Sequence, residues 1–231
     1  MTELPRALRI ASTQYMDEGR LVDEWDAIAF ERDRQLRGGV DRSFDEVLCP
    51  WVLAQLHDAE SIIDVGCGTG VLTERISTDR ARVVGIDPSA KSIEIARKHN
   101  PRGLYHVASL SQWVEGNPGA RFDLAVANMV LMDVLDVPAF LRGLRSVTAG
   151  GRVAMTFTHP MFWPDYWGYR TEDGFDYLAE LAIESPFRTA AQDLEHRTTH
   201  FHRPLSWYVS AIARAGLVIS DMHELRGPES M

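Results

Sequence analysis

The sequence has few cysteines, no long apolar run and no excess of positive charge. Its two cysteines, Cys49 and Cys67, are too few for a disulfide framework or a cysteine-rich zinc site, which favours a reducing compartment. It has neither the run of about 18 apolar residues that a membrane span needs nor a basic-then-apolar leader. We therefore expect a cytoplasmic protein with no membrane partner. The net charge of −9 disfavours a nucleic-acid partner without excluding a local basic groove.

The composition is that of a globular domain, with 45% apolar and 25% charged residues in a chain of 231. Short β-branched runs alternate with helical stretches from residue 61 onward, which predicts βαβ units and a mainly parallel sheet with helices on both faces. We expect a Rossmann-like, doubly wound α/β fold. Strands are expected at residues 61–65, 81–86, 104–107, 122–127 and 152–158, with a sixth at 217–225 after a last helix at 205–215.

Two segments depart from this alternation. Residues 1–58 contain two amphipathic stretches, the second kinked or split at Pro50, after an irregular start over residues 1–19. Residues 159–203 hold nine of the 21 Phe, Trp and Tyr residues. We expect residues 1–58 to form a helical lid over a core of residues 59–231, in which 159–203 is a substrate-facing insertion.

The strongest motif is a glycine-rich turn at the end of the first expected strand, residues 64–70 (DVGCGTG). Glycine tolerates positive φ and lets a ligand touch the backbone, and the helix that follows offers free N–H groups. Asp87 ends the second expected strand, 17 residues after Gly70, where a carboxylate can accept both hydroxyls of a ribose. Alone, the turn is equally a tight connection and Asp87 a helix N-cap. Together they favour a nucleotide-type ligand, and the spacing of Gly68 and Gly70 makes NAD the weaker alternative.

Four segments together resemble class I S-adenosylmethionine (SAM) dependent methyltransferases: residues 63–70 (IDVGCGTG), 84–89 (VGIDPS), 122–131 (FDLAVANMVL) and 144–151 (LRSVTAGG). Ser109 stands where that superfamily often has an adenine-binding Asp, and Ala149 replaces a usual Pro. Too few residues follow Leu225 for the superfamily's seventh, antiparallel strand. We expect that strand to be missing and an edge to be exposed, which invites pairing, for instance in a homodimer.

The resemblance implies a site for SAM, with S-adenosylhomocysteine (SAH) as the product. The backbone of the glycine turn should flank the methionine part of SAM, with Asp64 near its amino group. Asp87 should bind the ribose, and Pro88 should pack on the adenine. The other implied contacts lie at the adenine edge (Ser109, Leu110), on the sulfonium side (Asn128, Met129) and along the two loops (Gly66, Cys67, Gly68, Gly70, Ser89).

The acceptor is expected beyond the carboxyl ends of the strands, where the insertion begins. Aromatic side chains tolerate a sulfonium and stack on a planar acceptor, although a purely hydrophobic cap is the alternative. His159 directly follows the fifth strand and is our candidate base, or else a structural post. His196, His200 and His202 lack recognisable metal-ligand spacing, so we expect no metal. The expected acceptor contacts are Phe162, Trp163, Tyr166, Trp167, His202 and Arg203, the last two being equally suited to a helix start.

The sequence thus predicts a SAM-dependent methyltransferase that acts on a small, aromatic or otherwise planar metabolite. A histidine placed to remove a hydroxyl proton favours O-methylation. N-methylation of an amine suits an insertion with eight acidic residues against four arginines, and C-methylation stays open. Two further alternatives are a SAM-bound enzyme that catalyses a different reaction and a non-catalytic partner subunit of the same fold.

Overall fold

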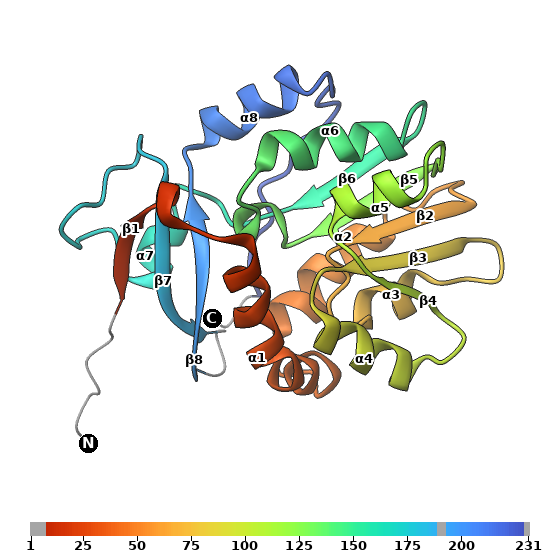
Figure 1. The fold of residues 1–231 in the computed structure, drawn as a ribbon, viewed down its shortest axis with the longest axis horizontal. Coiled ribbons are helices and arrows are strands. Elements are labelled where there is room, and N and C mark those ends of the chain that lie inside the picture. Colours follow the sequence, from red (N-terminus) through yellow and green to blue (C-terminus); the bar gives the residue numbers. More distant parts are fainter. Residues whose placement is uncertain (1–7, 189–192, 229–231) are drawn as a thin grey trace.

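The computed structural model describes residues 8–188 and 193–228. Its centre is a sheet of five strands in the order β4–β3–β2–β5–β6, and every neighbouring pair is parallel (Figure 1). The predicted doubly wound α/β fold is therefore confirmed. The strands are β2 (Ser61–Val65), β3 (Arg82–Asp87), β4 (Leu104–Val107), β5 (Leu124–Asn128) and β6 (Arg152–Thr156).

Both faces of the sheet are covered by helices, because its central strands are apolar on both sides. Ile62 faces a cluster formed with the helical turn η2 (Phe44–Leu48), α2 (Cys49–Leu53) and α3 (Val71–Ile76). Its neighbour Ile63 faces the opposite cluster, and both side chains are fully buried. Three helices supply that second cluster: α5 (Leu110–Gly116), α6 (Val137–Val147) and α8 (Leu205–Arg214).

A long helix crosses one end of this core. The helix α1 (Glu18–Arg37) packs beside α4 (Ala90–His99), as Figure 1 shows. The second amphipathic stretch divides next to Pro50, where the π-helical turn η2 passes into α2. A proline in the first turn of a helix costs no hydrogen bond, which explains the predicted division there.

The structure contains a second, smaller sheet that the sequence did not predict. Antiparallel strands β1 (Arg9–Ser12), β7 (Leu181–Arg188) and β8 (Asp193–His202) lie beside α1 and the short helix α7 (Trp163–Trp167) (Figure 1). The insertion is therefore largely a pair of strands, and part of the expected irregular start is its edge strand. A three-residue 3-10 turn, η1 (Thr13–Tyr15), links β1 to the start of α1.

The expected sixth strand at residues 217–225 is wrong. The chain forms no strand there, and the apolar side chains of Val218 and Met222 are 89% and 62% exposed. A short apolar segment forms a strand only where a partner strand and a buried face are available. Within the described residues, β6 is consequently an edge of the sheet. No helix in the described part of the chain is both long and apolar enough to cross a bilayer.

Candidate active site

A cavity of about 930 Å³ lies beyond the carboxyl ends of the parallel strands. The strand order reverses at β2, which has β3 on one side and β5 on the other. Such a reversal opens a crevice between the loops that leave the two strands. The cavity is bounded here by those loops, by α1, and by residues of α7 and β8 from the insertion.

The glycine turn after β2 has the backbone shape of a ligand cradle. Gly66, Gly68 and Gly70 have positive φ angles of 74°, 54° and 81°. A Cβ atom on Gly66 would lie 2.5 Å from Val130, whereas one on Gly68 would meet nothing within 4 Å. The Gly68 backbone therefore faces open space and is accessible to a ligand. Gly70 differs from its prediction, because it begins α3, packs against Tyr105 and does not line the cavity.

Asp87 ties the ends of β2 and β3 together. Its carboxylate accepts hydrogen bonds from the backbone N–H of Gly68 at 2.9 Å and of Ser89 at 2.8 Å. Burial raises its pKa to about 6, although these two hydrogen bonds act in the opposite direction. The N-cap of α4 is Ser89, so the alternative role for Asp87 as that cap does not hold. Asp87 lines the cavity with lone pairs left to accept further hydrogen bonds.

Asp64 is a second buried carboxyl on the cavity wall. It is 1% exposed and accepts a hydrogen bond of 2.6 Å from the Thr73 hydroxyl. Burial, with a smaller effect from the charge of Asp87, raises its pKa to about 7. Among the described residues, no lysine or arginine pairs with Asp64 or Asp87. Two such carboxyls beside an open glycine backbone fit a cationic ligand with hydroxyl groups. SAM is a ligand of this kind.

The other predicted cofactor residues also meet at this cavity. Pro88, Ser109, Leu110 and Met129 line it. Ser109 forms a capping box with Gln112 at the start of α5. Asn128 lines the cavity too, but its side chain accepts a hydrogen bond from the Thr156 hydroxyl. Cys67 lines it as a small buried residue, and burial raises the pKa of its thiol, which therefore stays protonated.

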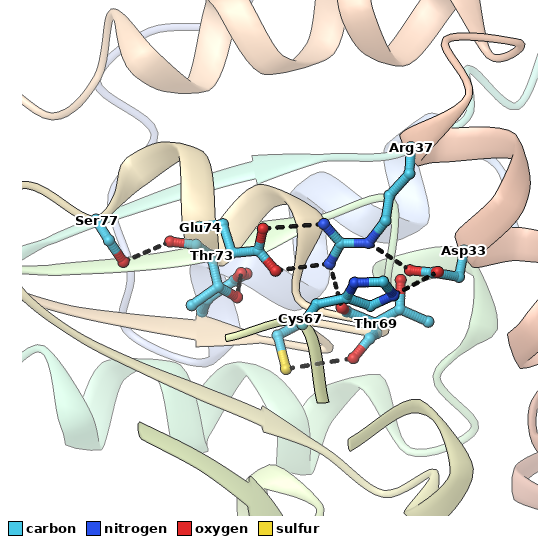
Figure 2. A network of polar contacts seen from close by, with 10 residues as sticks. Asp33, Arg37, Cys67, Thr69, Thr73, Glu74 and Ser77 are labelled. Atoms are coloured by element: carbon cyan, nitrogen blue, oxygen red, sulfur yellow. Dashed lines mark hydrogen bonds and ion pairs between the residues drawn. The ribbon is translucent and has the colours of Figure 1, made fainter. Parts of the chain in front are cut away.

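Polar contacts fasten α1 over the cofactor end of the cavity. Arg37 pairs with Glu74 of α3 through two bonds of 3.0 and 2.6 Å and reaches the Thr69 carbonyl at 3.4 Å (Figure 2). It also pairs with Asp33 at 2.9 Å on its own helix. Nearer the N-terminus of α1, Asp26 accepts hydrogen bonds from the Ser89 hydroxyl and the Lys91 amide at the start of α4. This helix thus bridges the two helices that follow the cofactor loops.

Aromatic side chains of α7 form the other end of the cavity. Phe162, Trp163, Tyr166 and Trp167 line it, and the Trp163 ring stacks on Tyr166 at 4.9 Å and on Trp167 at 5.7 Å between centroids. Rings held in this way offer a flat apolar surface to a planar ligand.

His159 lines the cavity between the loops and the aromatic end. Its Nε2 lies 3.0 Å from the Glu224 carboxylate, and its Nδ1 accepts a hydrogen bond of 3.2 Å from the Met161 amide. When the imidazole carries its proton on Nε2, Nε2 donates to Glu224 and the lone pair of Nδ1 accepts from the Met161 amide. The hydrogen bond at Nδ1 is the longer of the two.

His202 and Arg203 do not reach this cavity, so their expected acceptor contacts are corrected. Arg203 is fully buried and donates hydrogen bonds of 3.0 Å to the carbonyls of Val134 and Leu135. The His202 imidazole is within 3.1 Å of the Tyr177 carbonyl. Both residues fix β8 to neighbouring loops. Their role in this structure is to hold the insertion in place.

Two cavity residues with strongly shifted pKa values were not among the predicted site residues. Asp133 follows β5, and burial raises its pKa well above the ordinary value, with a smaller effect from the charge of Glu24. His200 of β8 lines the aromatic end, and burial lowers its pKa to about 3. Alternation of His200 with His202 was visible in the sequence, but the register that turns His200 inward was not. Across residues 8–188 and 193–228, no group of three or more His, Cys, Asp or Glu side chains is arranged to hold a metal ion.

Known proteins resemble this chain in both sequence and fold. A family model described as "Methyltransferase domain" matches residues 30–215. A ubiquinone biosynthesis O-methyltransferase of Methylobacterium sp. (strain 4-46) is 33% identical over 156 residues, which are 64% of this chain and 59% of the relative. The enzyme of that name from Methylobacterium nodulans is 37% identical over 97 residues, 41% of this chain and 39% of the relative. The chain thus matches less than two thirds of the length of these relatives.

A solved structure supports the fold. The SAM-dependent methyltransferase of Clostridium acetobutylicum superposes with a TM-score of 0.61 over 85% of this chain and 89% of that one, at 16% identity. Sheet order, glycine turn and second acidic loop together are those of a Rossmann-like nucleotide-binding fold. Since the family model covers most of the chain, the protein belongs to the class I SAM-dependent methyltransferases.

Proposed function

We propose that the protein transfers a methyl group from SAM to an oxygen atom of a small, planar acceptor. The observation that carries this proposal is the shape of the cavity of about 930 Å³. Its cofactor end has two buried carboxyls and an open glycine backbone, and its acceptor end has stacked aromatic rings. Donor and acceptor would meet inside a single enclosed space, which is what an in-line transfer requires.

The cofactor end has a group for each polar part of SAM. Asp64, oriented by Thr73, is placed to receive the ammonium. Asp87 holds the loop through Gly68 and Ser89 and retains lone pairs for the ribose hydroxyls. When bound, SAM supplies an electrophilic methyl group on a sulfonium. The chain's own residues bind it, orient it and keep water away.

The helix α1 acts as a lid in this proposal. Leu21, Trp25 and Ala29 line the cavity from above, while Asp26 and Arg37 fasten the helix to α4 and α3. Substrates would enter when these polar contacts open. The division into a lid of residues 1–58 and a core of 59–231 is part of the proposal, as is the substrate-facing role of 159–203.

His159 is the proposed base. The Glu224 carboxylate on Nε2 holds the tautomer in which Nδ1 carries the lone pair. A hydroxyl of the acceptor would replace the Met161 amide at Nδ1 and deliver its proton there as its oxygen takes the methyl group.

The choice of oxygen is supported by this imidazole and by the names of the similar enzymes, which are O-methyltransferases. N-methylation of a small amine is the second candidate, because Asp133 adds a carboxyl to the cavity outside the cofactor end. A homodimer stays a prediction.

A labelled-methyl assay tests the proposal. The protein would be incubated with methyl-deuterated SAM and a panel of phenols, catechols, amines and carbon acids, and products would be weighed by mass spectrometry. We expect a phenol or catechol to gain one labelled methyl group while SAH forms. Labelled amines with no labelled phenol would support the second candidate, and SAH-free turnover would contradict methyl transfer.

Two glycine variants provide a matched control. Gly68 and Gly119 both have positive φ, and a Cβ on either would meet nothing within 4 Å. Gly68→Ala and Gly119→Ala therefore carry the same backbone strain, but only Gly68 lines the cavity. We expect Gly68→Ala alone to lose SAM binding. Equal SAM affinity in the two variants would contradict the cradle assignment.

A further inference from the structure

A buried histidine without hydrogen bonds lies at the acceptor end of the cavity. His200 is 5% exposed, lines the cavity, and neither ring nitrogen has a hydrogen-bond partner. Its burial keeps the imidazole neutral, with one N–H donor and one lone pair. A buried polar group left unpaired costs about 1–3 kcal/mol, so native structures seldom keep one without a purpose.

Aromatic rings surround this imidazole, with Trp163 and Trp167 on the side of the main cavity and Tyr169 on the side of a smaller one. It meets Trp167 edge-on at 4.5 Å between centroids, and Trp163 and Tyr169 lie at 6.4 and 5.6 Å. The indole N–H groups of Trp163 and Trp167 are also buried without partners. Three neutral side chains with unused hydrogen-bonding capacity therefore meet at one place.

The strand β8 determines which way His200 points. The Thr199 side chain turns toward α1, where its hydroxyl donates to the Glu24 carboxylate at 3.2 Å, and its neighbours Thr198 and His200 turn the other way, toward the cavity that they line. Behind His200 lies a second cavity of about 10 Å³, which His202 and Arg203 also line. That volume holds one water molecule at most. A ligand larger than water can reach His200 only from the acceptor side.

We propose that His200 is an acceptor-binding residue, which hydrogen-bonds a hydroxyl or carbonyl oxygen on the ring edge of a planar acceptor, away from the atom that receives the methyl group. This inference rests on the proposed function and names the substrate class more closely. The oxygen is uncharged, because the three groups that meet it carry no charge. The rings of Trp163 and Trp167 shift slightly as the ligand enters, since they cover the nitrogens of His200.

Two probes of matched shape test the proposal: 2-naphthol, which has a hydroxyl, and 2-methylnaphthalene, which has a methyl group in its place. Their dissociation constants would be measured by equilibrium dialysis with SAH present, for wild type, His200→Phe and His196→Phe. The control residue His196 lies on the same strand, is exposed and does not line the cavity. The ratio of the two constants isolates the hydroxyl contact from general packing.

We expect His200→Phe to shift this ratio against 2-naphthol by about fivefold or more, and His196→Phe to leave it unchanged within about twofold. Imidazole ¹⁵N resonances of wild-type His200 should move with 2-naphthol and stay in place with 2-methylnaphthalene, which tests the contact even if His200→Phe does not fold. An equal ratio in all three proteins, unmoved resonances, or no binding of either probe overturns the inference. SAH affinity, measured in the same dialysis, distinguishes failure of this inference from failure of the proposed function. A protein that binds SAH and methylates an acceptor retains the proposed function even if the inference about His200 fails.

Discussion

The two ends of the cavity are built in different ways. The cofactor end is made of loops that leave adjacent strands, and its polar groups are joined to backbone amides, as Asp87 is to Gly68 and Ser89. The acceptor end combines α7 with β8, and three of its polar side chains, His200, Trp163 and Trp167, have no hydrogen-bond partner. The hydrogen bonds already made at the cofactor end suit it to one fixed ligand. The unused donors and acceptors at the acceptor end are left for the substrate to pair with.

The largest effect is expected at the acceptor end. His159→Ala should lower turnover about 100-fold or more, because a positioned base contributes at least that factor. SAM affinity, measured by calorimetry, should stay unchanged. His223→Ala is the control, since His223 pairs with Asp221 and does not line the cavity. Normal turnover in His159→Ala would show that His159 is not the base, and it would weaken the distinction between the cofactor end and the acceptor end.

At the cofactor end, Asp87→Ala should weaken SAM binding by at least about tenfold, because it removes charge-assisted hydrogen bonds worth about 1.5–3 kcal/mol each. It also frees the Gly68 amide from its anchor. Acceptor affinity, measured with the same probes and SAH omitted, should change little. Unchanged calorimetric affinity for SAM would refute the ribose assignment.

SAM binding should also depend on pH. The pKa of Asp64 is raised to about 7 and that of Asp87 to about 6, so both carboxyls gain protons as pH falls through this range. A cationic ligand favours the ionised forms, and SAM affinity should therefore rise by about tenfold or more from pH 5.5 to pH 7. Asp64→Asn should flatten the curve. A flat curve in the wild type would contradict the pairing of SAM with these groups.

The same raised pKa has a consequence for stability. A carboxyl that holds its proton more tightly when folded loses stabilisation as pH rises through its folded pKa. An asparagine side chain does not titrate, so Asp64→Asn loses no stabilisation in this pH range. The free energy of unfolding of ligand-free Asp64→Asn, relative to wild type, should thus increase between about pH 4 and pH 7. Denaturant titrations at several pH values measure this difference, and an unchanged difference would argue against the raised pKa.

The smallest effect is expected at the lid. Arg37→Ala removes the ion pair between α1 and Glu74 and the long hydrogen bond to the Thr69 carbonyl, although the Arg37 side chain itself does not line the cavity. SAM should dissociate about threefold faster, because a partly exposed ion pair contributes about 1 kcal/mol or less. Arg34→Ala is the control, since Arg34 pairs only within α1, with Glu31. Equal dissociation rates in both variants would remove the lid role from this contact.

The sequence predicted the cofactor end well, because its signal is local. The turn at residues 64–70 and Asp87 each follow a strand directly, so their meeting needs only the order of the sheet. The five parallel strands were predicted for the same reason, from alternation over short distances.

The acceptor end was predicted only in part, because it depends on long-range pairing. Nothing in the polar residues of β1 indicates that Arg9 will lie opposite Glu184. The aromatic residues of α7 were identified by composition, whereas His200 was passed over in favour of His202 and Arg203. Telling them apart requires the register of β7 against β8, in which Ile183 lies opposite His200. At residues 217–225 the order of helix, glycine and apolar segment predicted a strand, but the described residues provide no partner strand for it.

The pairing of β1 with β7 gives the molecule an order of assembly. Arg9–Ser12 is made first during synthesis, yet its partner Leu181–Arg188 leaves the ribosome only after the whole parallel sheet. Pairing between such distant segments cannot begin until β7 has been synthesised, however fast the earlier strands form. The three-stranded sheet, which carries His200 on β8, is therefore completed only after all five strands of the parallel sheet have been made.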